Sequence, residues 1–241
     1  MPFKNLLKSK LHPLVWERLG QAKQEYFWTR KSHHCEPDLI PFFEKYLSYK
    51  NGYFVDVGAF DGRSSSNTYH LEKSLDWRGV LIEPIMHQHF RSKQIRDSRY
   101  IFINAAAVSK DYKERTVELL YSASMSTVVT KGAEEEARVW ADEGKQYLSK
   151  SESVELTWSL ARTLDSILLE SNSPRIIDLL SIDVERNEYA VLSGTNMSSW
   201  TFKYIVIETK ENSEAFQNLT ENGYLHLGTF GNNVCFKHQE K

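Results

Sequence analysis

Two glycines and an acid in the first third of the chain have the spacing of a ligand-binding loop. The segment YFVDVGAFDGRSSSNT, residues 53–68, runs from an apolar stretch into Gly58 and Gly62. Glycines at the first turn after a strand let the backbone turn tightly and let a ligand approach where a Cβ would collide. Glu83 follows 21 residues after Gly62, at the end of the next apolar stretch. An acid at that place accepts hydrogen bonds from both hydroxyls of a ribose.

The kind of nucleotide is indicated by Asp56, two residues before Gly58. A dinucleotide pyrophosphate is bound by G-x-G-x-x-G, whereas this loop reads D-x-G-x-x-x-G, and a carboxylate there repels phosphates. The same carboxylate suits the amine and sulfonium of S-adenosylmethionine, contacted directly or through water, with Asp61 assisting. The alternatives are that Asp56 only fastens its own loop, or that the protein is a nicotinamide-dependent oxidoreductase.

Four acids late in the chain are candidates for the chemistry. If the activated methyl group of such a cofactor is transferred to a hydroxyl, the reaction requires an aligned acceptor, exclusion of water and a group that takes the proton. Asp183, Glu185 and Glu208 end or follow apolar stretches, and we take them as the catalytic candidates, with Glu188 within reach of the substrate. Converging carboxylates can hold Mg²⁺, here through Asp183 and Glu208. Otherwise one of them acts alone as the base, or Glu188 and Glu208 simply bond backbone amides.

The elements that must position these residues alternate between strands and helices. Strands are predicted at 53–57, 78–83, 100–104, 176–183 and 203–208, and helices at 36–48, 86–96, 161–170, 186–194 and 212–221. Ser64, Ser65 or Ser66 is expected to cap a helix that runs toward Ser74. Such alternation predicts an α/β fold with a mostly parallel sheet covered on both faces. Residues 224–238 predict a β-hairpin that turns near Gly231.

The segments between residues 115 and 158 are predicted from composition alone. RTVELLY, residues 115–121, and SVELTW, residues 153–158, are expected to be extended, with a polar helix over 132–149. The hydroxyl-rich stretch 122–130 is expected to fold over the substrate as a lid, which makes Ser126 a candidate substrate contact.

Composition sets broad limits on the protein. The chain has 241 residues, of which 41% are apolar and 26% charged, with a net charge of −2. This balance is typical of a soluble globular protein, and neither the charge nor any NPPY-like motif favours nucleic acid as a partner. No apolar run reaches the roughly 18 residues that cross a bilayer. Two cysteines are too few for a disulfide framework, so free thiols and a cytoplasmic location are expected.

Residues 1–31 differ from the rest because they carry a local charge of +5 with leucines at helix-like intervals. We predict an N-terminal helical extension over residues 1–50, before a single domain over residues 51–241. A basic amphipathic segment can contact an anionic membrane surface peripherally. The alternative is that it packs on its own domain or on a second subunit of a homo-oligomer.

Six segments, in order, resemble the FkbM-type S-adenosylmethionine-dependent methyltransferases. They are FVDVGAFDG, NTYHLEKSLDWRGVLIEP, NAAAVS, RTLDSIL, IDLLSIDVERNEYAVLSG and YIVIE, and the resemblance covers roughly residues 50–240. It implies a Rossmann-like fold with a seven-stranded sheet. It also implies O-methylation of a hydroxyl on a small molecule or a glycan, often a sugar hydroxyl.

The resemblance assigns further residues and also has two departures. It places Ala59 in the cofactor loop and puts Asn104 and Ala105 beside the adenine, although three successive alanines also suit tight packing. Arg186 and Asn187 stand where the family usually has Gly-Ala, and Phe60 stands where it often has Asn. Arg186 either grips a carboxylate or phosphate of the substrate or points to solvent. A non-catalytic binding module is the third hypothesis, which only the change at 186–187 favours.

Overall fold

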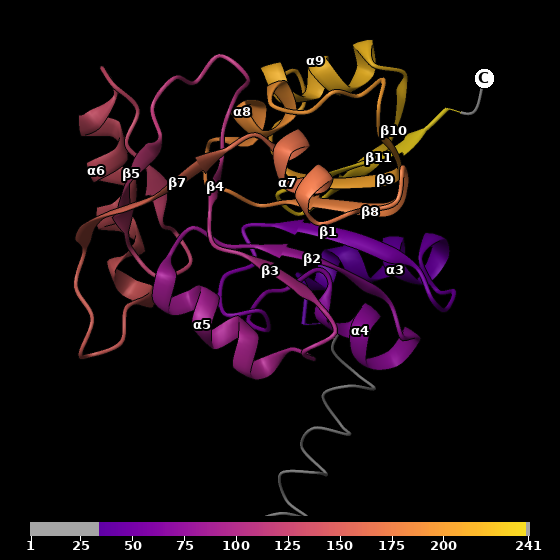
Figure 1. Cartoon of the computed structure of the whole chain (residues 1–241), viewed down its shortest axis with the longest axis horizontal. Helices are drawn as coiled ribbons and strands as arrows, with labels where there is room; N and C mark the ends of the chain where they lie inside the picture. The colour runs from indigo at the N-terminus through magenta and orange to yellow at the C-terminus, as the bar shows by residue number, and fades with distance from the viewer. Residues whose placement is uncertain (1–33, 240–241) are drawn as a thin grey trace, which may run out of the picture.

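A seven-stranded sheet forms the centre of the computed structural model, which describes residues 34–239 (Figure 1). Its strand order is β10-β11-β9-β8-β1-β2-β3. The five strands from β9 to β3 run parallel, whereas β11 is antiparallel to both β9 and β10. The strands are β1 (Tyr53–Val57), β2 (Arg78–Ile82), β3 (Ile101–Ile103), β8 (Ile176–Ile182), β9 (Thr201–Glu208), β10 (Tyr224–Phe230) and β11 (Asn233–His238). The α/β class and the terminal hairpin predicted from the sequence are confirmed.

Helices cover both faces of this sheet, with α7, α8 and α9 on one side and α3, α4 and α5 on the other (Figure 1). Successive side chains of β1 pack alternately against the helices on the two faces of the sheet, because side chains alternate along a strand. Val55 and Val57 belong to the core under α7 to α9, and Phe54 belongs to the core under α3 and α4. The helices are α3 (Ile40–Tyr46), α4 (Tyr69–Leu75), α5 (Met86–Ile95), α7 (Leu164–Glu170), α8 (Glu188–Ser193) and α9 (Glu214–Glu221).

A second, four-stranded sheet was not predicted as a unit. Its order is β4-β7-β5-β6, and the strands are β4 (Ala106–Ala107), β5 (Thr116–Tyr121), β6 (Thr127–Val128) and β7 (Glu155–Arg162). The predicted extended segments at 115–121 and 153–158 are thus confirmed as β5 and part of β7. The predicted helix over 132–149 is α6 (Glu134–Glu143) followed by the 3-10 turn η2 (Gly144–Tyr147). Figure 1 shows this sheet and α6 together at one side of the central sheet.

The helix after the glycine loop begins later than expected. The serines at 64–66 do not start it; α4 begins at Tyr69. The reason is that the Asp61 carboxylate accepts hydrogen bonds from the backbone N–H groups of Arg63 and Ser64, at 2.8 and 2.7 Å, which holds this stretch in a turn. In the same way α7 starts at Leu164 rather than at residue 161, because Thr163 caps it.

Residues 34–50 pack onto the domain. Phe42 and Phe43 of α3 are fully buried in the core that also contains Phe54. The predicted boundary at residue 50 stays a prediction, and the basic segment 1–31 lies outside the described residues. Cys35 and Cys235 are buried free thiols. Among residues 34–239, no helix combines the length and the apolar character needed to cross a bilayer.

Candidate active site

The glycine loop after β1 is fixed by close backbone contacts. Gly58 has a φ of +91°, and a Cβ there would lie 1.7 Å from the carbonyl oxygen of Asp183. Gly62 has a φ of +79°, and a Cβ there would lie 2.9 Å from the Ser92 side chain on α5. Only glycine fits either position, because both need the left-handed region and leave no room for a side chain. The loop is therefore held between the end of β8 and α5, where β1 and β8 form the crevice of the sheet.

Glu83, the predicted ribose acceptor, lies at the end of β2 and is bonded through both carboxylate oxygens. The backbone N–H of Phe60 donates to Oε2 and that of Ile85 donates to Oε1, each at 2.8 Å. Burial raises the pKa of Glu83 to about 7, although these two donors lower it. Asn104 does not face this carboxylate but donates through Nδ2 to the Glu83 carbonyl at 2.8 Å. Asn104 thus joins the ends of β2 and β3.

Asp56 lies inside a buried charge network. Its Oδ2 accepts from the Thr68 hydroxyl at 2.5 Å and lies 3.7 Å from the Arg96 guanidinium. Arg96 also donates to Thr68 and to Glu72 Oε2, the latter at 2.9 Å, and its side chain is completely buried. Burial raises the pKa of Asp56, and the charge of Arg96 opposes that shift. Asp56 therefore binds its own loop and α4 in this structure, which is the alternative function considered for it above.

The space between this loop and Asp183 is small. A cavity of about 50 Å³ is lined by Asp56, Gly58, Ala59, Phe60, Ser64, Ser65, Ser66, Asn67, Ser124, Ser181 and Asp183. Sites for drug-sized ligands usually enclose about 300 Å³ or more. This cavity alone is therefore too small for the whole of S-adenosylmethionine. The residues around it suit S-adenosylmethionine. Carboxylates can accept hydrogen bonds from its amine and its ribose hydroxyls, and the glycine backbone leaves room for its amino-acid portion. Ala105 is buried beside Glu83's strand end.

Three predicted catalytic carboxylates come together beyond the ends of β8 and β9. One oxygen from each of Asp183, Glu185 and Glu208 lies within 4.8 Å of the others. Burial, and then the negative charge of Glu208, raise the pKa of Asp183 well above its usual range. The same two causes raise the pKa of Glu185 to about 8. The cluster therefore holds protons at neutral pH unless a cation neutralises it.

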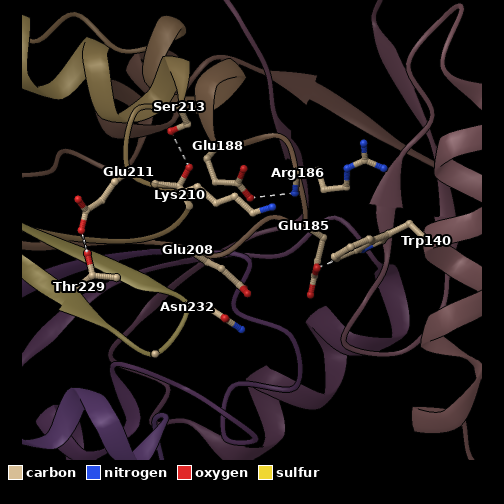
Figure 2. A pocket seen from close by; sticks show the side chains of 12 residues that line it. Trp140, Glu185, Arg186, Glu188, Glu208, Lys210, Glu211, Ser213, Thr229 and Asn232 are labelled. Atoms are coloured by element: carbon tan, nitrogen blue, oxygen red, sulfur yellow. Dashed lines mark hydrogen bonds between the residues drawn. The ribbon is translucent and has the colours of Figure 1, made fainter.

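Glu185 and Glu208 also border a pocket of about 590 Å³, drawn in Figure 2. Its lining combines an indole ring, carboxylates, hydroxyls, an amide and one ammonium group. The Lys210 side chain extends into the space between the surrounding acids. The lining residues are Trp140, Glu185, Arg186, Glu188, Glu208, Thr209, Lys210, Glu211, Ser213, Thr229, Gly231 and Asn232.

The loop between β8 and α8 is strained and tied to the small sheet. Glu185 and Arg186 have φ angles of +53° and +81°, which are unusual for residues with side chains. Thr127 of β6 donates to the Glu185 carbonyl at 2.7 Å, and the Trp140 indole donates to Glu185 Oε2 at 3.1 Å. The Arg186 guanidinium lies 5.6 Å from the centre of the Trp140 ring. Trp140 of α6 thus forms one side of the pocket, while β6 holds the loop that carries Glu185.

The structure brings most of the predicted acceptor-side residues together but not all. Arg186 and Glu188 line the pocket, and Glu188 Oε1 accepts from the Arg186 N–H at 2.9 Å. Ser126 does not line it, because its hydroxyl donates to the Ala123 carbonyl at 2.7 Å and closes a local turn. Sequence reasoning missed Trp140 and Lys210. A lone tryptophan in an otherwise polar helix was the available signal for Trp140; Lys210 had none.

The match to a family model decides the class. The model for the methyltransferase FkbM domain matches residues 56–227. The chain belongs to the FkbM methyltransferase domain family. Membership supports dependence on S-adenosylmethionine and removes the support for the nicotinamide alternative. No curated protein matches the chain.

Two solved structures are similar to parts of this FkbM-family chain. One is a methyltransferase FkbM from Methylobacillus flagellatus KT, with 14% identity and a TM-score of 0.47 over 87% of this chain and 50% of that one. The other is a SAM-dependent methyltransferase from Leishmania major, with 10% identity and a TM-score of 0.36 over 83% of this chain and 69% of that one. The chain thus spans half the length of the first protein.

Proposed function

We propose that this protein transfers a methyl group from S-adenosylmethionine to a hydroxyl of a sugar in a glycan or glycoconjugate. The supporting observation is the place of Asp183. This residue lines the small cavity at the glycine loop, while its carboxylate lies within 4.8 Å of Glu185 and Glu208, which line the 590 Å³ pocket. Asp183 therefore stands where the cofactor side and the acceptor side meet.

The lining of the larger pocket supports a carbohydrate acceptor. The Trp140 ring offers an apolar surface of the kind that packs against the flat face of a pyranose. Carboxylates and amides around it, such as Glu188 and Asn232, match the donors and acceptors of several hydroxyl groups. A volume of about 590 Å³ lies within the usual range for small-ligand sites.

Each residue of the site has a part in the proposed reaction. The backbone of Gly58 and Ala59, with Asp61 holding the loop, would carry the cofactor, and Glu83 would bind its ribose. When bound, S-adenosylmethionine supplies an electrophilic methyl group. Asp183 or Glu185, in its ionised form, takes the proton of the acceptor hydroxyl, and the raised pKa of either carboxyl makes its ionised form a stronger base.

A cation such as Mg²⁺ fits the same carboxylates. Asp183, Glu185 and Glu208 provide hard oxygen ligands close enough to share one ion. It would neutralise the cluster and lower the pKa of a hydroxyl bound to it.

The test is methyl transfer from labelled S-adenosylmethionine to a panel of oligosaccharides, with and without Mg²⁺. We expect Asp183→Asn to reduce the rate at least about 100-fold while S-adenosylhomocysteine still binds. Asp142→Asn, an exposed change on α6, is the control and keeps full activity. Transfer to amines or thiols but to no hydroxyl would contradict the proposal.

A further inference from the structure

The outer face of β7 carries an exposed apolar stripe. Leu156, Trp158 and Leu160 are 48%, 56% and 57% exposed, and they share one face because they alternate along the strand. The opposite face of the small sheet packs on the core through Val117, Leu119 and Tyr121 of β5. Each of the three side chains leaves on the order of 100 Å² in water. Apolar side chains gathered in this way on one surface usually mark an interaction site.

β7 also has an open edge along this stripe. On one side it pairs with β5 over the six residues Glu155–Leu160, but on the other β4 covers only Ala161 and Arg162. Among the described residues, no strand therefore pairs with that edge over Glu155–Leu160. An unpaired edge with an apolar face is a template for another strand.

The hydrogen bonds show which backbone groups face the open edge. The Ala161 N–H donates to Arg115 next to β5, whereas the Arg162 carbonyl accepts from Val108 next to β4. Because these directions alternate along a strand, the N–H and C=O groups of Leu156, Trp158 and Leu160 point to the open edge. The three residues of the apolar stripe are thus also the residues whose backbone N–H and C=O groups are available to form hydrogen bonds with another strand.

We propose that a second copy of this chain pairs with this edge, so that two β7 strands run antiparallel about a two-fold axis. If the two-fold axis is perpendicular to the sheet, both apolar stripes lie on the same face. Residues directly opposite each other also share a face, so each even-numbered stripe residue must lie opposite an even-numbered residue of the second copy. Centring the pair on Thr157 uses the edge from Val154 to Leu160 and stops where β4 begins. It places Leu156 opposite Trp158 of the second copy, with their backbone groups facing each other.

One buried polar group supports this register. The Ser159 hydroxyl is buried and has no hydrogen-bond partner among the described residues. The pairing centred on Thr157 places Glu155 of the second copy directly opposite Ser159, on the same face of the sheet. Opposite residues of an antiparallel pair lie about 4.5–5.5 Å apart, so the carboxylate is within reach of the hydroxyl. A membrane or an unrelated protein would not specifically supply an acceptor there.

Sedimentation equilibrium of the full chain tests the proposal. We expect a mass twice the 28.0 kDa of one chain, and a mass of one chain for Trp158→Asp. Leu169→Asp is the matched control, because Leu169 is 58% exposed but lies on α7, outside the proposed paired edge, and this variant should remain dimeric. A monomeric native chain overturns the proposal, and so does a dimer that survives Trp158→Asp.

The register has its own test. Thr157→Cys should form a disulfide with itself across the axis under mild oxidation, since the two Cα atoms of such a pair lie about 4.5 Å apart. Leu160→Cys should not, because its opposite residue is Val154. The native thiols are buried and do not interfere. A cross-link at residue 160 but none at residue 157 overturns the register.

Discussion

The cofactor loop and the acceptor pocket both bury carboxylates at the ends of parallel strands, but they neutralise them differently. At the cofactor loop, Glu83 binds two backbone N–H groups and Asp56 has Arg96 nearby. At the acceptor pocket, Asp183 and Glu185 have acids as their main charged neighbours. At the cofactor loop the protein itself supplies the donors and the cation that balance the buried negative charge. At the acceptor pocket, that charge must be balanced by a bound proton or a cation. This difference is expected where a proton is exchanged during a reaction.

The largest effect is expected from removing the compensation on the cofactor side. Arg96→Met leaves Asp56 buried without a cation and Glu72 paired with Lys73 alone, so the free energy of unfolding should fall by about 3–5 kcal/mol. Thermal and urea unfolding would measure it. Arg99→Met is the matched control, because Arg99 pairs with Asp76 and Asp97 in solvent and its removal should change stability far less. Equal losses for the two variants would show that the buried network contributes nothing particular.

The reverse effect is expected on the acceptor side. The pKa of Glu185 is about 8 in the folded chain and near 4.5 in the unfolded chain. Between pH 4.5 and pH 8, Glu185 is therefore protonated in the folded state and ionised in the unfolded state. Its contribution to stability is present below about pH 4.5 and is lost as pH rises toward 8. Glu185→Gln should therefore leave stability unchanged at pH 4.5 and raise it by on the order of 2 kcal/mol at pH 8.

Urea unfolding of both proteins across this pH range measures the effect. Glu143→Gln, on the outer part of α6, is the control and should give no pH-dependent difference. If Glu185→Gln destabilises the protein equally at every pH, the repulsion between the Glu185 and Glu208 carboxylates does not affect stability.

The smallest effect concerns the strained loop beside the cluster. Arg186 has a φ of +81° where the family usually has glycine, while Asn187 has a φ of −114°. Arg186→Gly relieves strain of about 1 kcal/mol but loses the contact with Trp140, worth about 0.5–1 kcal/mol. Asn187→Gly relieves none. The first variant should thus be more stable than the second by up to about 0.5 kcal/mol in thermal unfolding, and the opposite order would show that the loop is unstrained.

Sequence reasoning succeeded where one local pattern determines one element. The β1 loop, with Gly58 and Gly62, and the terminal hairpin follow from turn chemistry and strand alternation. The convergence of Asp183, Glu185 and Glu208 followed from their place at the ends of neighbouring parallel strands. These features depend on contacts that the strand order itself sets.

The remainder depends on tertiary contacts that no local pattern records. Arg96, forty residues after Asp56 and fully buried, supplies the positive charge that faces it, and no local pattern indicated this contact. Trp140 reaches the acceptor pocket only because the small sheet places α6 there. That sheet pairs residues around 118 with residues around 158, and nothing in either stretch specifies the other.

Calorimetric titration with S-adenosylhomocysteine, with NADH in parallel, tests the central claim most directly. The claim is that Glu83 and the glycine loop bind the cofactor without needing the carboxylate charge of Asp183. It predicts micromolar binding of S-adenosylhomocysteine to the native protein and to Asp183→Asn, at least about tenfold weaker binding to Glu83→Gln, and none of NADH. Absence of S-adenosylhomocysteine binding to the native protein, or binding of NADH in its place, would contradict the account.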